Sequence, residues 1–376
     1  MVYLDNSATT AVCPAAAEKA AYMMTTCFGN PSSLHTLGFR AEQEMEHTRR
    51  IAAEWLGVKP GELVFTSGGT EANNLALFGG AEAKKRVGRH IVTTAVEHSS
   101  VTAACAELER QGWEITRLLP DREGQITLQQ VLTACRSDTV LVSVMLVNNE
   151  TGARFPVESM APAIRRQSPQ ALLHCDVVQA AGKLPLNLTR LGVDLASVSG
   201  HKIHAPKGVG LLYIRRGARI LPRTFGGGQE AGRRSGTEAT PAIAALGAAI
   251  TALPSPGDQR RLYERLQQRL IGGLSDRSDI RFHLPPGGVP YLTHLSVPGI
   301  RSETMLHFLA EREVYISSGS ACSKGKKSPV LSAMGLSEGE IDSALRISFS
   351  YTNTEEDIDA FVQALKQAAD TLVRNV

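Results

Sequence analysis

Short apolar runs alternate with longer segments of helical periodicity through the first two thirds of the chain. The apolar runs predict strands over Leu63–Thr66, His90–Thr94, Val140–Val147, Ala171–Cys175, Leu195–Val198 and Gly210–Ile214. The segments between several of them predict helices over Glu71–Ala83, Ser99–Gln111 and Pro156–Arg166. Val140–Val147 is nearly continuous in apolar residues, as in a strand that is buried on both faces. The alternation therefore favours an α/β layer with a largely parallel sheet.

The pattern changes at residues 252–258, where Ala-Leu-Pro-Ser-Pro-Gly-Asp predicts a linker or a helix break. The remaining elements are expected at Gln259–Gly272 (helix), Leu292–Val297 (strand), Ser302–Glu313 (helix), Leu345–Ser350 (strand) and Thr354–Val373 (amphipathic helix). This mixture of elements predicts a smaller α+β domain after the linker.

Composition narrows the functional classes. The 376 residues contain 40 Lys+Arg and 37 Asp+Glu, a formal net charge of +3. The basic residues are spread out, which argues against a dedicated nucleic-acid-binding domain. The longest apolar runs, Val140–Val147 and Ala242–Leu253, fall short of the roughly 18 residues of a membrane span, and residues 1–7 do not resemble a signal peptide. We expect no membrane association.

The six cysteines stand at positions 13, 27, 105, 135, 175 and 322, without a CxxC pair or a cluster. This spacing argues against a disulfide framework and against a structural zinc site. All but the last are expected to be small buried hydrophobic residues. A reducing cytoplasm is therefore the expected location, and no metal is expected.

Candidate chemistry follows the predicted strands, because open α/β sheets bind ligands beyond the carboxyl ends of their strands. After Leu63–Thr66, the turn Ser67–Thr70 contains two glycines and opens a helix whose N-terminal N–H groups suit a phosphate. An ordinary capped turn is the alternative. The chain has no GxGxxG and no Walker pattern, so neither a dinucleotide nor a nucleoside triphosphate is indicated.

Three further strand ends carry polar residues. His98 follows one strand, Asp176 with Gln179 follows a second, and Lys202 follows a third. Taken singly, the histidine could be a surface residue and the aspartate a helix cap. A lysine directly after a buried strand is poorly solvated, which lowers the pKa of its amine as a Schiff-base lysine requires. His201 and His204 could be imagined as metal ligands, but no third ligand is suggested nearby. Together, the phosphate turn, histidine, aspartate and lysine are the parts of a pyridoxal-phosphate site.

Because these features follow one another in this order along the chain, the chain resembles the fold-type-I pyridoxal-phosphate enzymes. Within them it is closely similar to the class-V-aminotransferase-like cysteine desulfurases of the NifS/IscS class. The motifs that carry the resemblance are Tyr3–Thr10 (YLDNSATT), Gly29–His35 (GNPSSLH), Thr66–Asn73 (TSGGTEAN), Val147–Gly152 (VNNETG), Ser199–Lys202 (SGHK), Arg234–Thr237 (RSGT), Ser317–Cys322 (SSGSAC) and Leu345–Phe349 (LRISF). They extend over nearly the whole chain.

The resemblance implies an α/β fold with a mostly parallel seven-stranded sheet in a large domain, residues 14–253. Residues 1–13 and 254–376 would form a smaller α+β domain that carries the catalytic-cysteine loop. The family forms homodimers with shared sites.

The resemblance also implies a role for each site residue. Lys202 would hold pyridoxal 5'-phosphate and later move the Cα proton, Asp176 would pair with the pyridine nitrogen, and His98 would stack on the ring. Partners of the ring hydroxyl oxygen would be Asn149 and Gln179. The phosphate would be held by Gly69, Thr70, Ser199 and His201, with Thr237 reaching the phosphate of the neighbouring subunit. Arg346 would bind the substrate carboxylate, since a guanidinium group can hold a carboxylate through two parallel hydrogen bonds. Asn30 and Asn149 would assist this contact.

Cys322 separates this family from the aminotransferases. By resemblance, it attacks the sulfur of L-cysteine, giving L-alanine and an enzyme persulfide that is passed to a protein acceptor. That acceptor would serve iron–sulfur cluster, thiolated tRNA or cofactor synthesis. Lys324, Lys326 and Lys327 favour the thiolate. Residues 317–328 are small residues and lysines without periodicity, which predicts a mobile loop. The stretch after Cys322 is shorter and more basic than in the iron–sulfur housekeeping members, which leaves the acceptor open.

Three other functions fit parts of the pattern. A selenocysteine lyase shares the motifs, and an aminotransferase or another lyase shares the scaffold but has no need of Cys322. A sulfur-relay subunit with a decayed cofactor site is less consistent with the joint presence of Lys202, Asp176, His98 and Arg346.

Overall fold

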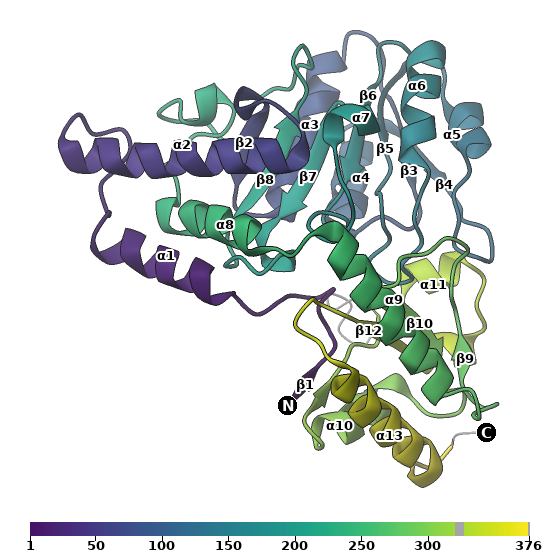
Figure 1. Ribbon diagram of the computed structural model, residues 1–376. Helices are drawn as coiled ribbons and strands as arrows, with labels where there is room; N and C mark the ends of the chain where they lie inside the picture. The colour runs from purple at the N-terminus through teal and green to yellow at the C-terminus, as the bar shows by residue number, and fades with distance from the viewer. Residues whose placement is uncertain (320–326, 375–376) are drawn as a thin grey trace.

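The computed structural model describes residues 1–319 and 327–374, and a seven-stranded sheet forms its centre (Figure 1). The order across the sheet is β2 (Leu63–Thr66), β8 (Gly210–Ile214), β7 (Leu195–Ser199), β6 (Leu172–Asp176), β5 (Thr139–Ser143), β3 (His90–Thr94) and β4 (Glu114–Leu118). Only β8 runs antiparallel to its neighbours, and the other pairs are parallel. The predicted mostly parallel seven-stranded sheet is confirmed.

Apolar residues line both faces of this sheet because successive side chains of a strand point to opposite sides. One face contributes Val64, Leu141, Leu172, Leu195 and Leu212 to a cluster with helices α3 (Gly69–Lys84) and α4 (Ser99–Arg110). The other face contributes Phe65, Val142, Leu173, Ala196 and Leu211 to the largest core cluster. The near-continuous apolar runs in the sequence reflect this two-sided burial.

The remaining helices of the first part of the chain surround the sheet or extend from it. They are α1 (Pro14–Thr25), α2 (Thr36–Leu56), α5 (Leu128–Ala134), α6 (Val157–Gln167), α7 (Leu188–Leu191) and α8 (Thr240–Ala252). Both α1 and α2 pack on α8, and the three helices reach out to one side of the sheet (Figure 1).

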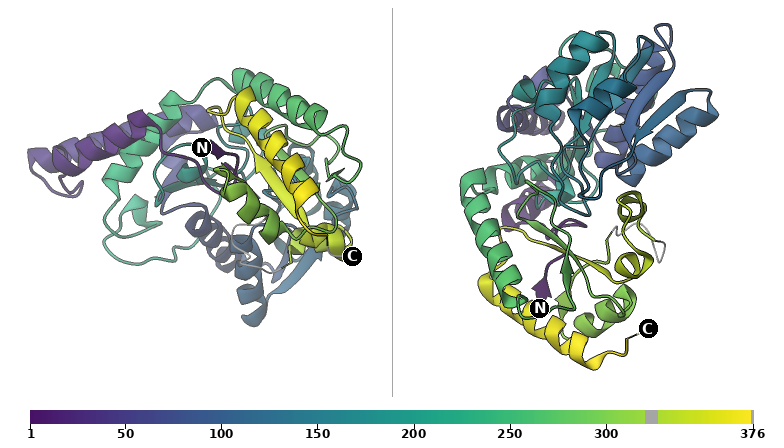
Figure 2. Two further views of the ribbon diagram at one scale, coloured as in Figure 1. Left: turned by 90° about the horizontal axis from the view of Figure 1, so that it is seen from below. Right: turned by 90° about the vertical axis from the view of Figure 1, so that its right-hand side faces the viewer.

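Two small sheets lie below the large one in Figure 1, together with both chain ends. One has the order β12 (Ala344–Ser348), β10 (Leu292–Ser296) and β9 (Arg281–Phe282), and the other pairs β1 (Val2–Tyr3) with β11 (Val314–Tyr315). The helices here are α9 (Pro256–Gly273), α10 (Ser302–Ala310), α11 (Pro329–Ala333), α12 (Glu338–Asp342) and α13 (Glu355–Thr371). Figure 2 shows α9, α10 and α13 at the outer side of this part.

The break expected at residues 252–258 is confirmed, since α8 ends at Ala252 and α9 begins at Pro256. The division into domains 14–253 and 1–13 with 254–376 stays a prediction. The largest core cluster includes residues of both parts, among them Leu4, Val92 and Phe349. The two parts therefore share buried contacts. None of the described helices has the length and apolar character needed to cross a membrane.

Two expectations need correction, and one strand was not predicted. The strand expected to Val147 ends at Ser143, and the Met145 N–H instead donates to the buried Glu97 carboxyl at 2.9 Å. The helix expected to Glu313 ends at Ala310, because Glu313 turns the chain with a φ of 56°. Strand β4 was absent from the pattern because it forms a half-exposed edge of the sheet with charged residues.

Candidate active site

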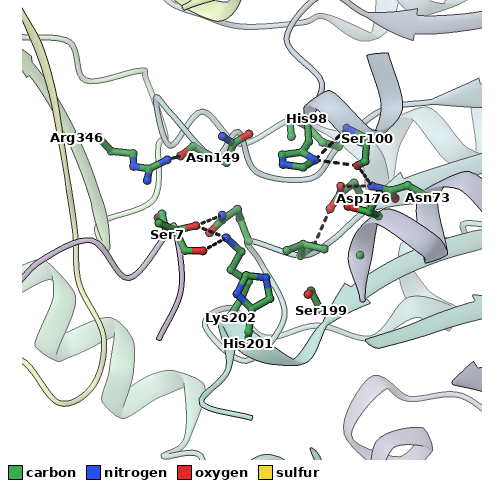
Figure 3. Close-up of a pocket in the computed structure, with 16 residues that line it drawn as sticks. Ser7, Asn73, His98, Ser100, Asn149, Asp176, Ser199, His201, Lys202 and Arg346 are labelled. Atoms are coloured by element: carbon green, nitrogen blue, oxygen red, sulfur yellow. Dashed lines mark hydrogen bonds between the residues drawn. The ribbon is translucent and has the colours of Figure 1, made fainter. Parts of the chain in front are cut away.

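A cavity of about 230 Å³ opens at the carboxyl ends of the parallel strands (Figure 3). It brings together most of the residues that the sequence predicted, namely Gly69, Thr70, His98, Asn149, Asp176, Gln179, Ser199, His201, Lys202 and Arg346. Its other lining residues are Ser7, Ala8, Asn73, Ser100, Met145 and Val178. Side chains of both parts of the chain therefore meet in one pocket.

One end of the cavity is shaped to receive a phosphate. Gly69 begins α3, and a Cβ atom added there would lie 3.0 Å from Val178 Cγ2 and 3.4 Å from the Ser199 Cβ. The preceding Gly68 has a φ of 149°, a backbone conformation that favours glycine. The bare helix N-terminus and the hydroxyls of Thr70 and Ser199 form a donor set that suits an anion.

His201 contributes to the same end as a neutral imidazole. Its Nδ1 lies 3.1 Å from Thr9 Oγ1. Burial, together with Lys202 and other nearby basic groups, lowers the pKa of His201 to about 4. At neutral pH the ring can therefore donate one N–H without carrying a charge.

A chain of hydrogen bonds fixes the carboxylate and the imidazole at the other end. Asn73 Nδ2 donates to Asp176 Oδ2 and to Ser100 Oγ, both at 2.8 Å, and Val178 N donates to Asp176 Oδ1 at 2.9 Å. The Ser100 N–H donates to His98 Nδ1 at 3.2 Å, which leaves the ring hydrogen of neutral His98 on Nε2. Burial lowers the pKa of His98, so the neutral form is favoured.

Lys202 follows β7 in a short 3-10 turn and reaches into the cavity between the two ends. Its Nζ donates to the carbonyl oxygens of Ser7 at 2.5 Å and Ala8 at 2.7 Å. Gln179 Nε2 donates to the same Ser7 carbonyl at 3.0 Å. The N-terminal segment thus holds the lysine at the cavity wall.

Arg346 enters the cavity from β12 and is only 1% exposed. Its Nη1 donates to the Asn149 carbonyl oxygen at 2.9 Å, and its Nη2 pairs with Asp5 Oδ1 at 2.8 Å. Within the described chain, Arg346 Nε is a buried donor that has no acceptor. A buried guanidinium with an unused N–H at a cavity wall suits a carboxylate ligand.

These donors and acceptors fit pyridoxal phosphate. The anion-binding end matches its phosphate, the hydrogen-bonded Asp176 carboxylate matches a protonated pyridine nitrogen, and Lys202 supplies the amine that such cofactors require.

Asn30 and Thr237 are exposed and do not line this cavity. Asn30 Oδ1 instead accepts a hydrogen bond from Ser32 N at 2.9 Å. Cys322 lies outside the described residues. The roles expected for these three residues stay predictions.

The sequence reasoning missed several residues that shape the pocket. Asn73 stands four positions after Gly69, so the helical spacing could have placed it on the same face. Ser100 could have been found as the first-turn partner of the N-cap His98. No local pattern places the Ser7 carbonyl beside Lys202, because the two residues stand 195 positions apart in the chain.

A model of the aminotransferase class-V family matches residues 2–361. The chain belongs to this family. Cysteine desulfurase 2 of Trichormus variabilis is 40% identical, and the match covers 99% of this chain and 94% of the relative. A solved NifS-like protein superposes with a TM-score of 0.93 at 36% identity, covering 99% of this chain and all of that one. A structure titled SspA in complex with cysteine superposes with a TM-score of 0.83 at 33% identity, covering 93% and 99%.

Family membership confirms the expected fold-type-I architecture and the similarity to the NifS/IscS class. Enzymes of the aminotransferase class-V family use pyridoxal phosphate, so the expected cofactor is confirmed as well.

Proposed function

We propose that this chain is a cysteine desulfurase that converts L-cysteine to L-alanine and places the sulfur on Cys322 as a persulfide. The observation that carries the proposal is the single cavity that combines Lys202, Asp176, His98 and the buried Arg346. Full-length relatives named cysteine desulfurase, at 40% identity, support the same activity. The aminotransferase alternative gives no role to Cys322.

The cofactor would be held along the length of the cavity. Gly69, Thr70, Ser199 and His201 would bind its phosphate, and Asp176, fixed by Asn73, would face the pyridine nitrogen. Gln179 and Asn149 would lie at the ring hydroxyl oxygen. His98, whose Nδ1 is occupied by Ser100, would lie against the ring face. The bound cofactor supplies an electron sink for the carbanion at Cα of the amino acid.

Substrate would be oriented by Arg346, which Asp5 and the Asn149 carbonyl hold in place. Asn30 is proposed to assist this contact. The amine of Lys202 would take the proton from Cα and hold it close to the reacting atoms. The Cys322 thiolate would then attack the substrate sulfur, the Cβ–S bond would break, and protonation of Cβ would give the methyl group of alanine.

A homodimer is the proposed assembly, with Thr237 reaching the phosphate of the partner subunit. Large apolar side chains are mostly exposed near α1 and α2, with exposed fractions of 64% for Phe28, 105% for Leu34 and 54% for Phe39. A patch of this kind is typical of a protein interface. Thr237 is also exposed and lies outside the cavity of its own chain.

A protein that accepts the persulfide sulfur is the proposed partner, and the cytoplasm is the proposed location. Cys13, Cys27, Cys105, Cys135 and Cys175 are free and buried, as expected for structural thiols in a reducing compartment. Burial raises the pKa of the Cys105 thiol to about 12, so this cysteine is not a competing nucleophile.

The proposed activity is tested by alanine and sulfide release from L-cysteine in the presence of a thiol reductant, with wild type and Cys322→Ser in parallel. We expect equal amounts of both products from wild type and none from the variant. Undiminished turnover by Cys322→Ser, or formation of a keto acid, would instead identify a lyase or an aminotransferase. A large preference for selenocysteine that does not depend on Cys322 would identify a selenocysteine lyase.

A further inference from the structure

Lys183 is a buried lysine in the turn that follows β6, close to the cofactor pocket but not part of its wall. Its side chain is 4% exposed. Its Nζ donates to Gln179 Oε1 at 3.3 Å and lies 5.0 Å from the centroid of the Tyr291 ring. Among residues 1–319 and 327–374, no carboxylate forms an ion pair with it. A buried cation without a counter-ion lowers the stability of the folded chain.

The hydrogen bonds of Gln179 connect this lysine to the pocket. Lys183 Nζ is the donor in its contact with Gln179, so the Gln179 amide oxygen points toward the lysine. The amide nitrogen therefore points the other way and donates to the Ser7 carbonyl, which also accepts from Lys202 Nζ. Tyr291 Oη donates to the Gln179 carbonyl oxygen at 2.7 Å and secures the same turn.

The groups that face Lys183 are mainly basic. Those that interact with it electrostatically are Lys202, Arg346, His201 and His204. Tyr291 contributes only its ring face and a phenol that is already engaged as a donor. Burial, followed by repulsion from Lys202 and Arg346, lowers the pKa of Lys183 to about 7. The lysine therefore adds to the positive potential behind the pocket, and does so in a pH-dependent way.

We infer that Lys183 is a positioning residue for the cofactor. It holds Gln179 so that the amide N–H points toward the pocket, and it places a second positive charge close to Lys202. This inference rests on the proposed cofactor site. The N–H would meet the ring hydroxyl oxygen as a donor. The nearby positive charge would disfavour a proton on the nitrogen of Lys202 that is attached to the cofactor.

The direct test is a pH titration of the absorption band of the bound cofactor in purified holoenzyme. Lys183→Met keeps the length of the side chain but removes its charge and its N–H donors. We expect the pH midpoint of the band to rise by about one unit, as loss of a nearby charge in a partly screened site implies. The apo-protein should bind added pyridoxal phosphate several-fold more weakly, because the Gln179 amide is no longer fixed.

Lys207→Met is the matched control. Lys207 is exposed, belongs to the same basic neighbourhood of His201, and has no proposed role in the pocket. Its removal should leave the midpoint unchanged. Lys183→Met should also unfold at no lower temperature than wild type, because an apolar side chain of similar volume replaces a buried unpaired charge.

An unchanged midpoint in Lys183→Met, with a band that disappears in Lys202→Ala, overturns this inference and leaves the proposed site standing. A loss of thermal stability without a shift of the midpoint assigns Lys183 a purely structural role and also overturns it. A band that persists in Lys202→Ala overturns the proposed site together with the inference.

Discussion

At the scale of single residues, Glu97 is the most unusual carboxyl group near the pocket. It is 5% exposed, and its Oε1 accepts hydrogen bonds from Thr94 Oγ1 and from Met145 N, both at 2.9 Å. Its Oε2 is buried and has no partner among the described residues. Burial raises the pKa of Glu97 to about 8, and nearby Asp176 adds to the shift. The neutral acid is therefore the stable form of Glu97 at pH 7.

This shift predicts a particular pH dependence of stability. The folded chain keeps a proton on Glu97 that the unfolded chain releases from pH 4.5, so the free energy of unfolding falls as pH rises from there to about 8. Glu97→Gln keeps both accepted hydrogen bonds but cannot ionise. Its stability relative to wild type should grow across this window, by at most about 1.4 kcal/mol per pH unit.

Urea unfolding at several pH values measures this difference. The control is Glu18→Gln, which changes an exposed glutamate and should show no such trend. A constant difference between wild type and Glu97→Gln from pH 5 to about 8 would contradict a buried neutral acid.

The functional role of a residue could be predicted from the sequence where that residue follows the end of a strand. Lys202, Asp176 and the Gly69 turn were found because each stands directly after an apolar run. Lys183 does not follow a strand end directly, and the position of Glu97 after β3 did not indicate that its carboxyl group is buried. Charged residues are normally solvated, and their burial depends on distant segments such as Met145 and Tyr291.

At the scale of elements, a buried ion pair ties the segment before Thr237 to the sheet. Glu230 accepts hydrogen bonds from Arg49 of α2, at 2.7 and 3.0 Å, and from Phe65 N of β2, a strand at the edge of the sheet. The side chains of Arg49 and Glu230 are only 11% and 2% exposed. Glu230 and Ala231 both have positive φ angles, 51° and 54°, so the pair holds a strained turn in place.

Loss of one partner should therefore be strongly destabilising. Glu230→Ala leaves the Arg49 guanidinium with the Glu46 carboxylate and the Leu63 carbonyl as its remaining partners, and we expect the free energy of unfolding to fall by about 2 to 3 kcal/mol. Glu264→Ala is the control, since its ion pair with Arg260 is exposed and should contribute less than about 1 kcal/mol. Equal losses in urea unfolding for the two variants would refute the role of the buried pair.

Helix α2 is an element that the sequence pattern did not predict, although the charged helices α9 and α13 were expected. Helix α2 carries many charged residues, and its buried positions are mostly small ones such as Ala41, Ala52 and Ala53. Small apolar residues give little contrast against polar neighbours, whereas the Val- and Leu-rich strands stand out. The strand ends that build the pocket were consequently predicted more completely than the helices around them.

At the scale of the whole molecule, the fold followed from strand–helix alternation and from motifs in family order. The assembly of subunits cannot be derived from a single chain.

The proposed dimer predicts that Leu34→Asp combined with Phe39→Asp yields a monomer in light scattering, because a charge in an apolar interface is costly. Leu119→Asp changes an exposed leucine far from α1 and α2 in the sequence and should leave the dimer intact. A monomeric wild type, or a dimer unaffected by the double change, would contradict the proposed interface.

The most direct test of the central claim locates the transferred sulfur. Holoenzyme incubated with L-cysteine and no reductant should carry one added sulfur atom on the peptide that contains Cys322, as measured by mass spectrometry. The added sulfur atom should be absent from Lys202→Ala and from enzyme that has not been incubated with L-cysteine. Alanine formed without any sulfur on Cys322, or sulfur found on another cysteine instead, would contradict desulfuration through this residue.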